Sequence, residues 1–115
     1  MSDKIKTGAD GENMAARYLE SKGYHVLARN YRCGRGEIDI IVQRDNWILF
    51  VEVKTRTSTK YGEPEQTVSY GQARRIYAAA ENYIFATNWR GHVRFDVIAI
   101  TLGAGIVHFE DAINF

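Results

Sequence analysis

The sequence predicts a single α/β domain over residues 1–115, in which a mixed β-sheet with a central antiparallel hairpin lies between two helices. Three observations predict this class. Residues 36–56 read as two β-strands around a tight turn, residues 10–22 and 67–86 carry helical patterns of apolar residues, and residues 93–101 are a run of strong β-formers. The predicted order is helix, three strands, helix and two strands.

Composition excludes several classes of protein. A chain of 115 residues supports one core, and 45% hydrophobic with 25% charged residues is ordinary for a globular domain. The net charge of +1 argues against a strongly basic nucleic-acid binder, so any such contact must rely on local clustering. A single cysteine excludes an internal disulfide. Without an apolar signal core or a run of transmembrane length, we expect a cytoplasmic protein with no membrane association.

The first helix is expected to begin near Ala9 or Asp10, after a frayed polar start over residues 1–7, and to end at Gly23. Glu12 precedes three apolar residues by three, four and seven positions, and these are Ala15, Ala16 and Leu19. This spacing places Glu12 on the buried stripe of the helix. Position alone leaves two interpretations open, a first-turn glutamate favoured by the helix dipole or a member of a site.

Residues 24–31 are predicted to form the first strand, with His25 at the surface or strand edge. The glycine-rich segment 32–36 is predicted to be a loop. Its Arg32 and Arg35 are candidates for phosphate contacts, since guanidinium forks and bare backbone amides both bind phosphate. A plain surface turn is the alternative.

Asp45 and Asn46 are the best turn candidates for the central hairpin, because both residues tolerate a positive φ. Counting outward from them places Asp39 opposite Glu52 and Glu37 opposite Lys54. One face of the hairpin is then wholly apolar, with Ile38, Ile40 and Val42 against Val53, Val51 and Leu49.

Two opposed carboxylates repel each other. At 4 Å and an effective dielectric constant of 20, the cost is on the order of 4 kcal/mol. Asp39 opposite Glu52 therefore calls for a cation, a raised pKa or a different register. A hard divalent ion such as Mg²⁺ binds one or two carboxylates and keeps its waters. Lys54 lies two residues after Glu52 and points the same way, so an ammonium group joins the two acids.

Residues 55–64 are predicted to form a mobile cationic loop, in which Arg56 and Lys60 either grip a nucleic-acid strand or are simply exposed. The helix over residues 67–86 is expected to bury Val68, Gln72, Ile76, Ala79, Ala80 and Tyr83. Its Arg74 and Arg75 either reach nucleic acid or are solvated.

The strand over residues 93–101 places Arg94 and Asp96 on one face. An ion pair or a cap for the neighbouring loop is the favoured role for Asp96, rather than catalysis. A final short strand is expected over residues 106–109, with His108 structural or exposed.

Asp39, twelve intervening residues and then Glu52-Val53-Lys54 resemble the Asp…Glu-x-Lys signature of the restriction-endonuclease-like nuclease superfamily. More closely, six segments in order resemble the small bacterial UPF0102 (YraN-like) family of suggested endonucleases, which is similar to archaeal Holliday junction resolvases. The segments are GADGENMAARYLESKGY, LARNYR, GEIDIIV, FVEVKTR, ARRIYAAAENYI and RFDVIAI.

This resemblance implies a restriction-endonuclease-like three-layer sandwich and a metal-dependent endonuclease that acts on structured DNA, as a possible homodimer. Mg²⁺ or Mn²⁺ would be held by Asp39 and Glu52, with Glu12 as a third acid and the backbone carbonyl of Val53 as a further ligand. Lys54 would orient or deprotonate the attacking water, with Glu37 beside it. Gln72 stands where the family leads us to expect lysine, so its supporting role is in doubt.

Two other functions remain open from the sequence. The fold could serve as a module that binds nucleic acid or a protein without useful turnover, or the polar pairs could be plain surface features of a structural domain. Exposed ion pairs contribute roughly 0–1 kcal/mol, which does not explain why two acids should oppose each other.

Overall fold

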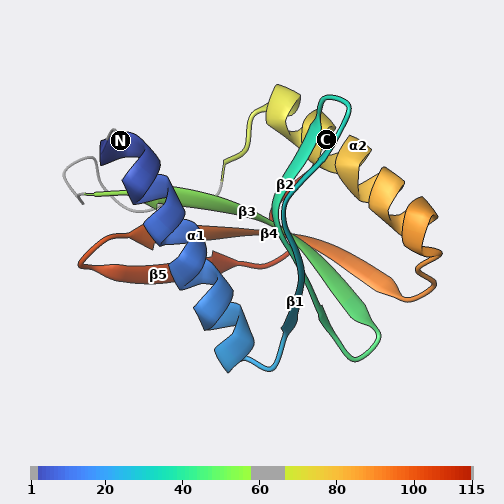
Figure 1. Ribbon diagram of the computed structural model, residues 1–115, viewed down its shortest axis with the longest axis horizontal. Coiled ribbons are helices and arrows are strands. Elements are labelled where there is room, and N and C mark those ends of the chain that lie inside the picture. The colour runs from blue at the N-terminus through green and yellow to red at the C-terminus, as the bar shows by residue number, and fades with distance from the viewer. Residues whose placement is uncertain (1–2, 58–66, 115) are drawn as a thin grey trace.

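A computed structural model of the protein describes residues 3–57 and 67–114. The chain forms α1 (Asp3–Ser21), β1 (His25–Cys33), β2 (Gly36–Arg44), β3 (Trp47–Arg56), α2 (Tyr70–Thr87), β4 (His92–Thr101) and β5 (Gly105–Phe109) (Figure 1). The order of helices and strands is the predicted one. No helix within the described ranges is long and apolar enough to cross a membrane.

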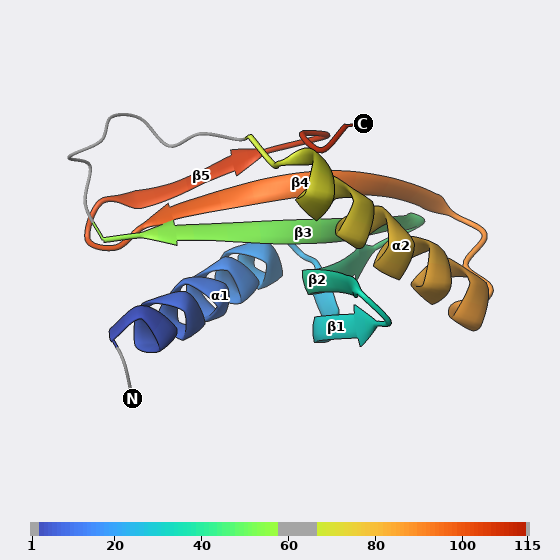
Figure 2. The same cartoon turned by 90° about the horizontal axis from the view of Figure 1, so that it is seen from above.

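The five strands form one mixed sheet in the order β1-β2-β3-β4-β5. All neighbours pair antiparallel except β3 and β4, which are parallel and are joined through α2. Figure 2 shows β3, β4 and β5 side by side, while β1 and β2 turn away from them. The antiparallel β2–β3 hairpin is thus the centre of the sheet, as predicted.

Two apolar cores cover opposite faces of the sheet. Leu49 and Val51 of β3 pack in the core that contains Ala15, Ala16 and Leu19 of α1. The alternate residues Ile48 and Phe50 pack with Ala73, Ile76, Ala79 and Ala80 of α2. Because successive strand residues point to opposite faces, the two helices lie on opposite sides and the fold has three layers.

Helix α1 begins at Asp3, seven residues or so earlier than predicted. The polar segment before Ala9 suggested a frayed start, but its lysines are good helix formers and it contains no proline. Gly11 lies against β3, where an added Cβ would come within 1.9 Å of Thr55 Oγ1. The glycine therefore serves close packing of α1 on the sheet and does not end the helix.

The predicted loop over residues 32–36 is mostly strand. Arg32 and Cys33 belong to β1 and Gly36 begins β2, so that only Gly34 and Arg35 form the turn. Gly34 has a φ of 58°, which suits a two-residue hairpin turn. At the β2 side of this turn, a Cβ on Gly36 would lie 2.7 Å from the backbone nitrogen of Ala79, so the hairpin packs directly on α2.

The register of the central hairpin is confirmed from Arg44↔Trp47 to Ile40↔Val51, and Asp45 in the turn has a φ of 52°. Beyond Ile40 and Val51 the two strands part. Residues 37 and 38 of β2 pair with β1, while residues 52–56 of β3 pair with β4. The predicted cross-strand pairs Asp39–Glu52 and Glu37–Lys54 are therefore wrong.

Three further expectations need correction. Ile38 packs in the α2 core with Ile41, since β2 bends with the β1–β2 hairpin toward α2. Strand β3 continues through Thr55 and Arg56, because β4 supplies partners for both residues. Helix α2 begins at Tyr70 and buries Ala73 where the sequence suggested Gln72. The rest of the predicted cationic loop, with Lys60, lies outside the described residues.

Candidate active site

The parting of β2 and β3 creates a fork in the sheet, visible in Figure 1 where β2 turns upward and β3 continues to the left. We use the name strand fork for this region, defined by Asp39 of β2 with Glu52 and Lys54 of β3. All three side chains are half-buried. The sequence identified these residues, but it assigned them to a continuous ladder and not to an opening between strands.

Asp39 replaces a missing ladder bond. Its Oδ2 atom accepts a hydrogen bond from the backbone N–H of Val53 at 2.8 Å. In a continuous hairpin that donor would meet a carbonyl of the neighbouring strand, and a half-buried donor without a partner is costly. The Asp39 carboxylate thus accepts the hydrogen bond of a backbone N–H that has lost its strand partner. The same hydrogen bond fixes the orientation of the carboxylate.

Both acids of the strand fork have raised pKa values. Burial raises the pKa of Asp39 from its ordinary value to about 6, opposed by the Val53 hydrogen bond and supported by the charges of Glu12 and Glu37. Burial and the charge of Asp39 raise the pKa of Glu52 to about 8, although Lys54 lowers it. The charge of Asp39 therefore acts on Glu52 and favours the protonated form of its carboxyl group.

Glu12 of α1 acts on the strand fork through its charge, which raises the pKa of both Asp39 and Glu52. Its own carboxylate lies 3.8 Å from Arg29 of β1, and the same arginine donates a 2.8 Å hydrogen bond to Asn13 Oδ1. Within the described residues, no group of three or more Asp, Glu, His or Cys is close enough to hold one metal ion. A third acid at the metal stays a prediction.

Lys54 and Glu37 do not pair with each other, contrary to the sequence-based interpretation. The Lys54 ammonium donates to the backbone carbonyl of Thr67, three residues before α2. Glu37 instead lies 3.4 Å from Arg32, its register partner on β1. The two residues are separated because β2 pairs with β1 at Glu37, whereas β3 pairs with β4 at Lys54.

Gln72 caps α2. The Ser69 hydroxyl accepts a hydrogen bond from the Gln72 backbone N–H at 3.1 Å, and Gln72 Oε1 accepts one from the Ser69 backbone N–H at 3.3 Å. This is a capping box, in which two otherwise unsatisfied donors at the helix start find acceptors. The spacing Ser-x-x-Gln at residues 69–72 carries that signal in the sequence, and the sequence-based interpretation missed it.

We expect Gln72→Ala to lower the free energy of unfolding by about 0.5–1 kcal/mol, because it removes one acceptor of the capping box. Gln72→Glu should retain the wild-type stability, since glutamate fills the same position and favours the helix N-terminus. Urea unfolding of the three proteins measures this. Equal losses in both variants would show that the cap does not explain Gln72.

The sequence profile described as "Uncharacterised protein family UPF0102" matches residues 11–100. The chain belongs to the UPF0102 family. UPF0102 proteins from Cytophaga hutchinsonii and Rhodococcus opacus are 42% and 41% identical to it, over 95% and 97% of this chain and 96% and 99% of their own lengths. One from Syntrophus aciditrophicus is 45% identical over 97% of this chain and 91% of its own.

The resemblance of the six sequence segments to UPF0102 is thereby confirmed. The matched region contains Glu12 and the whole strand fork, together with the first turns of α2. The family description and the names of these relatives state membership and no activity.

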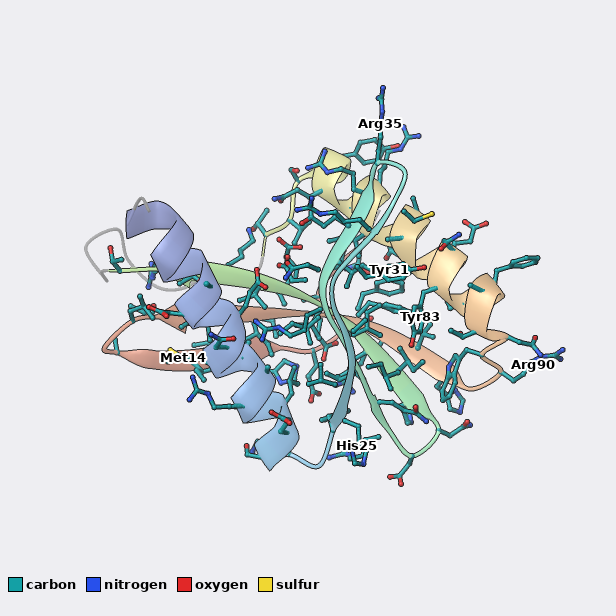
Figure 3. All side chains as sticks on the ribbon, in the orientation of Figure 1. Met14, His25, Tyr31, Arg35, Tyr83 and Arg90 are labelled. Atoms are coloured by element: carbon teal, nitrogen blue, oxygen red, sulfur yellow. The ribbon has the colours of Figure 1, made fainter. Side chains whose placement is uncertain are left out.

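The cationic candidates of the UPF0102 chain fall into two groups. Four are exposed arginines, two on the β1–β2 hairpin and two on α2, namely Arg32, Arg35, Arg74 and Arg75. Arg35 projects from the tip of its hairpin in Figure 3. Arg56, by contrast, is half-buried and donates from Nε to Thr101 Oγ1 at 2.9 Å. It belongs to the sheet and not to a free loop.

Asp96 forms the second charged cluster of the UPF0102 chain, outside the strand fork. It is fully buried and accepts two 2.9 Å hydrogen bonds from Arg94, one of 2.7 Å from His108 and one of 3.0 Å from the Asp111 backbone. Burial raises the pKa of Asp96, but the bonds from His108, Arg94 and Asp111 outweigh it and hold the pKa below its ordinary value. The predicted ion pair and loop cap are both confirmed.

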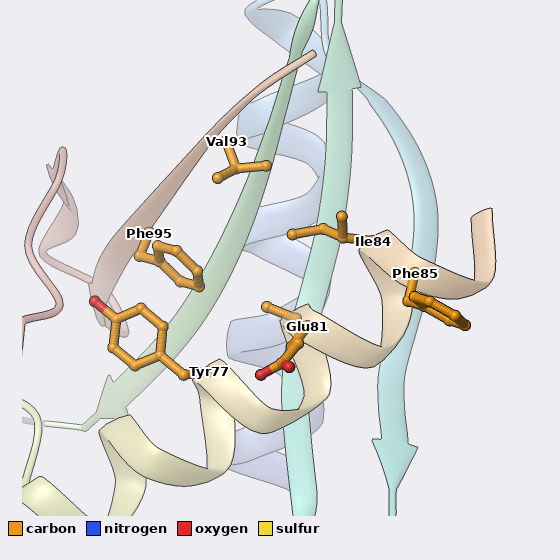
Figure 4. A pocket seen from close by; sticks show the side chains of 7 residues that line it. Tyr77, Glu81, Ile84, Phe85, Val93 and Phe95 are labelled. Carbon is orange, nitrogen blue, oxygen red and sulfur yellow. The ribbon is translucent and has the colours of Figure 1, made fainter. Parts of the chain in front are cut away.

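A separate hollow lies between α2 and β4, with a volume of about 530 Å³ (Figure 4). Its walls are almost wholly apolar, and Glu81 is its one charged lining residue. None of the predicted site residues lines it. Charged groups converge at the strand fork and not in this hollow, which favours the strand fork as the site of chemistry.

Proposed function

We propose that this UPF0102 chain is a metal-dependent nuclease of the restriction-endonuclease-like type, which hydrolyses phosphodiester bonds in structured DNA. The observation that carries the proposal is the pair of half-buried acids Asp39 and Glu52, whose pKa values are raised to about 6 and about 8, beside Lys54. Half-burying two neighbouring acids destabilises the folded protein, and carboxylates with raised pKa values cluster at functional sites.

The donor set fits Mg²⁺ or Mn²⁺. Both acids offer hard oxygen ligands. In the metal-free protein the two carboxylates repel each other when both are ionised, and a bound divalent ion would neutralise this negative charge. Mg²⁺ is commonly held by one or two carboxylates, with waters and substrate phosphate oxygens completing its shell. A site with two acids is therefore sufficient, and Glu12 and the Val53 carbonyl are further candidate ligands.

Each residue of the strand fork then has a role. Asp39 and Glu52 would hold the ion, with the Asp39 carboxylate oriented by the Val53 N–H. A bound divalent ion lowers the pKa of a coordinated water and screens charge on the phosphate. The Lys54 ammonium, now on the Thr67 carbonyl, would turn to the phosphate oxygens or to the attacking water. Glu37 acts at a distance, through its charge on both acids.

A binding module without turnover is the second candidate. It is favoured by one observation, that Glu12 is paired with Arg29 and that no three-acid group occurs within residues 3–57 and 67–114. In that case the acids would contribute no chemistry. The nuclease is preferred because a binding module gives no reason for two acids to share a half-buried fork.

Cleavage assays separate these functions. The wild-type protein should cut at least one of labelled duplex, flap and four-way-junction DNA with Mn²⁺ and none of them in EDTA. Asp39→Ala should lower the cleavage rate by at least about 100-fold and leave DNA binding intact. Glu20→Ala, which removes an exposed acid of α1, is the matched control and should cut normally. Cleavage that survives Asp39→Ala, or that needs no metal, would overturn the proposal.

A further inference from the structure

The first two turns of α2 present an aromatic ring among cations. Tyr70, the first residue of the helix, is 66% exposed. The Arg74 guanidinium lies 5.8 Å from the centre of the Tyr70 ring, one turn further along the helix. Arg75 is also exposed, and the first turn of α2 contains no acidic residue. An exposed ring beside guanidinium groups is the combination that binds single-stranded nucleic acid.

Local packing holds this surface in place. The Ser69–Gln72 capping box fixes where the helix begins, and therefore where Tyr70 stands. Gly71 has no side chain, and its Cβ position would lie 3.6 Å from Arg75 Nη1. The Arg75 guanidinium thus extends back over Gly71 toward the helix start. Tyr70, Arg74 and Arg75 together are named the α2 platform.

The α2 platform lies next to the strand fork. Lys54 donates to the carbonyl of Thr67, which is three residues before Tyr70. Three residues of extended chain span at most about 11 Å. The backbone of Tyr70 is therefore no more than about 11 Å from the residue that Lys54 of the strand fork contacts.

Positive charge continues from the platform to the β1–β2 hairpin. Arg75 precedes Ala79 by one helical turn on the same side of α2, and Ala79 is the residue against which Gly36 packs. Gly36 follows the turn of the β1–β2 hairpin, which carries Arg32 at the end of β1 and Arg35 in the turn, with Arg35 projecting outward in Figure 3. The packing of Gly36 on Ala79 thus joins the helix that carries Arg74 and Arg75 to the hairpin that carries Arg35 and the Glu37-paired Arg32, and exposed guanidinium groups suit a phosphate backbone.

We propose that the α2 platform binds an unpaired nucleotide, with its base stacked on Tyr70 and its phosphates on Arg74 and Arg75. The substrate class is then single-stranded DNA or duplex DNA with an unpaired segment next to the cut. A uniform duplex cannot use the platform, because its base faces are covered by neighbouring bases. The statement about the cut rests on the proposed nuclease function, whereas the statement about binding does not.

Binding is tested in EDTA, where no cleavage occurs, by fluorescence anisotropy with a labelled oligo-dT strand and a blunt duplex of the same length. Tyr70→Ala should weaken binding of the single strand by about 5- to 100-fold and change duplex binding little. Tyr70→Trp should retain it. Arg74→Ala and Arg75→Ala should weaken both DNAs and reduce the salt dependence by about one phosphate contact each.

Phe85→Ala is the matched control, since Phe85 is an 88% exposed aromatic residue at the other end of the same helix. It should bind both DNAs as the wild type does. The proposal is overturned if the wild type does not bind the single strand, if Tyr70→Ala binds it as the wild type does, or if that variant loses both DNAs equally. If Tyr70-dependent binding is present and Mn²⁺-dependent cleavage is absent, the platform stands and the nuclease proposal fails.

Discussion

Replacing Glu52 with glutamine is expected to stabilise the metal-free protein at about pH 9 while abolishing metal-dependent cleavage. Burial and the charge of Asp39 raise the pKa of Glu52 in the folded protein from its ordinary 4.5 to about 8. Between these values the folded state binds more protons than the unfolded state, so stability falls as the pH rises. Above pH 8 the folded protein carries the full cost of the ionised group. Glutamine never ionises and avoids that cost.

The gain should amount to a few kcal/mol in the free energy of unfolding at pH 9, and should vanish near pH 4, where both proteins carry a neutral group. Denaturant unfolding of wild type and variant across this pH range measures the difference. Glu20→Gln, an exposed glutamate of α1, should follow the wild-type curve. If Glu52→Gln is no more stable than the wild type at pH 9, then ionised Glu52 does not destabilise the folded protein.

Asp96→Ala is expected to cause the largest loss of stability, about 3–5 kcal/mol. The substitution leaves the Arg94 guanidinium without the buried carboxylate that it grips through two 2.9 Å bonds, and it removes the acceptor of the Asp111 N–H. Breaking a buried charged pair on one side costs more than the pair contributes, because the remaining charge stays desolvated. His108 loses its partner as well, and with it the anchor for its contact with the Tyr18 hydroxyl of α1.

Glu110→Ala removes the exposed partner of Arg94 and leaves the buried partner, Asp96, in place. Glu110 lies 3.4 Å from Arg94, and its side chain is 63% exposed. Its removal should change the free energy of unfolding by roughly 0–1 kcal/mol. Thermal unfolding of both variants at pH 7 checks the contrast, and similar losses in the two would contradict the structural role assigned to Asp96.

The sequence predicted the fold well where local signals and tertiary packing agree. The turn at Asp45 and Asn46 and the register up to Ile40↔Val51 follow from turn chemistry and from alternation of apolar residues. The fork beyond them was not predictable from the hairpin alone. It depends on contacts between distant segments, such as Gly36 on Ala79 and Gly11 on Thr55, which carry β1–β2 toward one helix and hold β3 on the other.

For the site, residue types were easier to predict than partners. The sequence predicts Asp39 and Glu52 as an interacting pair from a register that the structure does not have, yet in the structure the charge of Asp39 still raises the pKa of Glu52. Glu37 and Lys54 were paired wrongly for the same reason. Gln72 had a readable capping signal, whereas the contact of His108 with Asp96 depends on β5 pairing next to β4, which periodicity cannot locate.

The most direct test of the acid pair as a metal site is the number of protons released when Mn²⁺ binds. With a pKa of about 8, Glu52 is mostly protonated at pH 7 and must lose its proton to become a ligand. Calorimetric titration in two buffers with different ionisation enthalpies should give close to one proton released per bound ion. Binding should be lost in Glu52→Gln and in Asp39→Asn. Mn²⁺ binding that releases no proton, or that persists in both variants, would contradict a metal site at the strand fork.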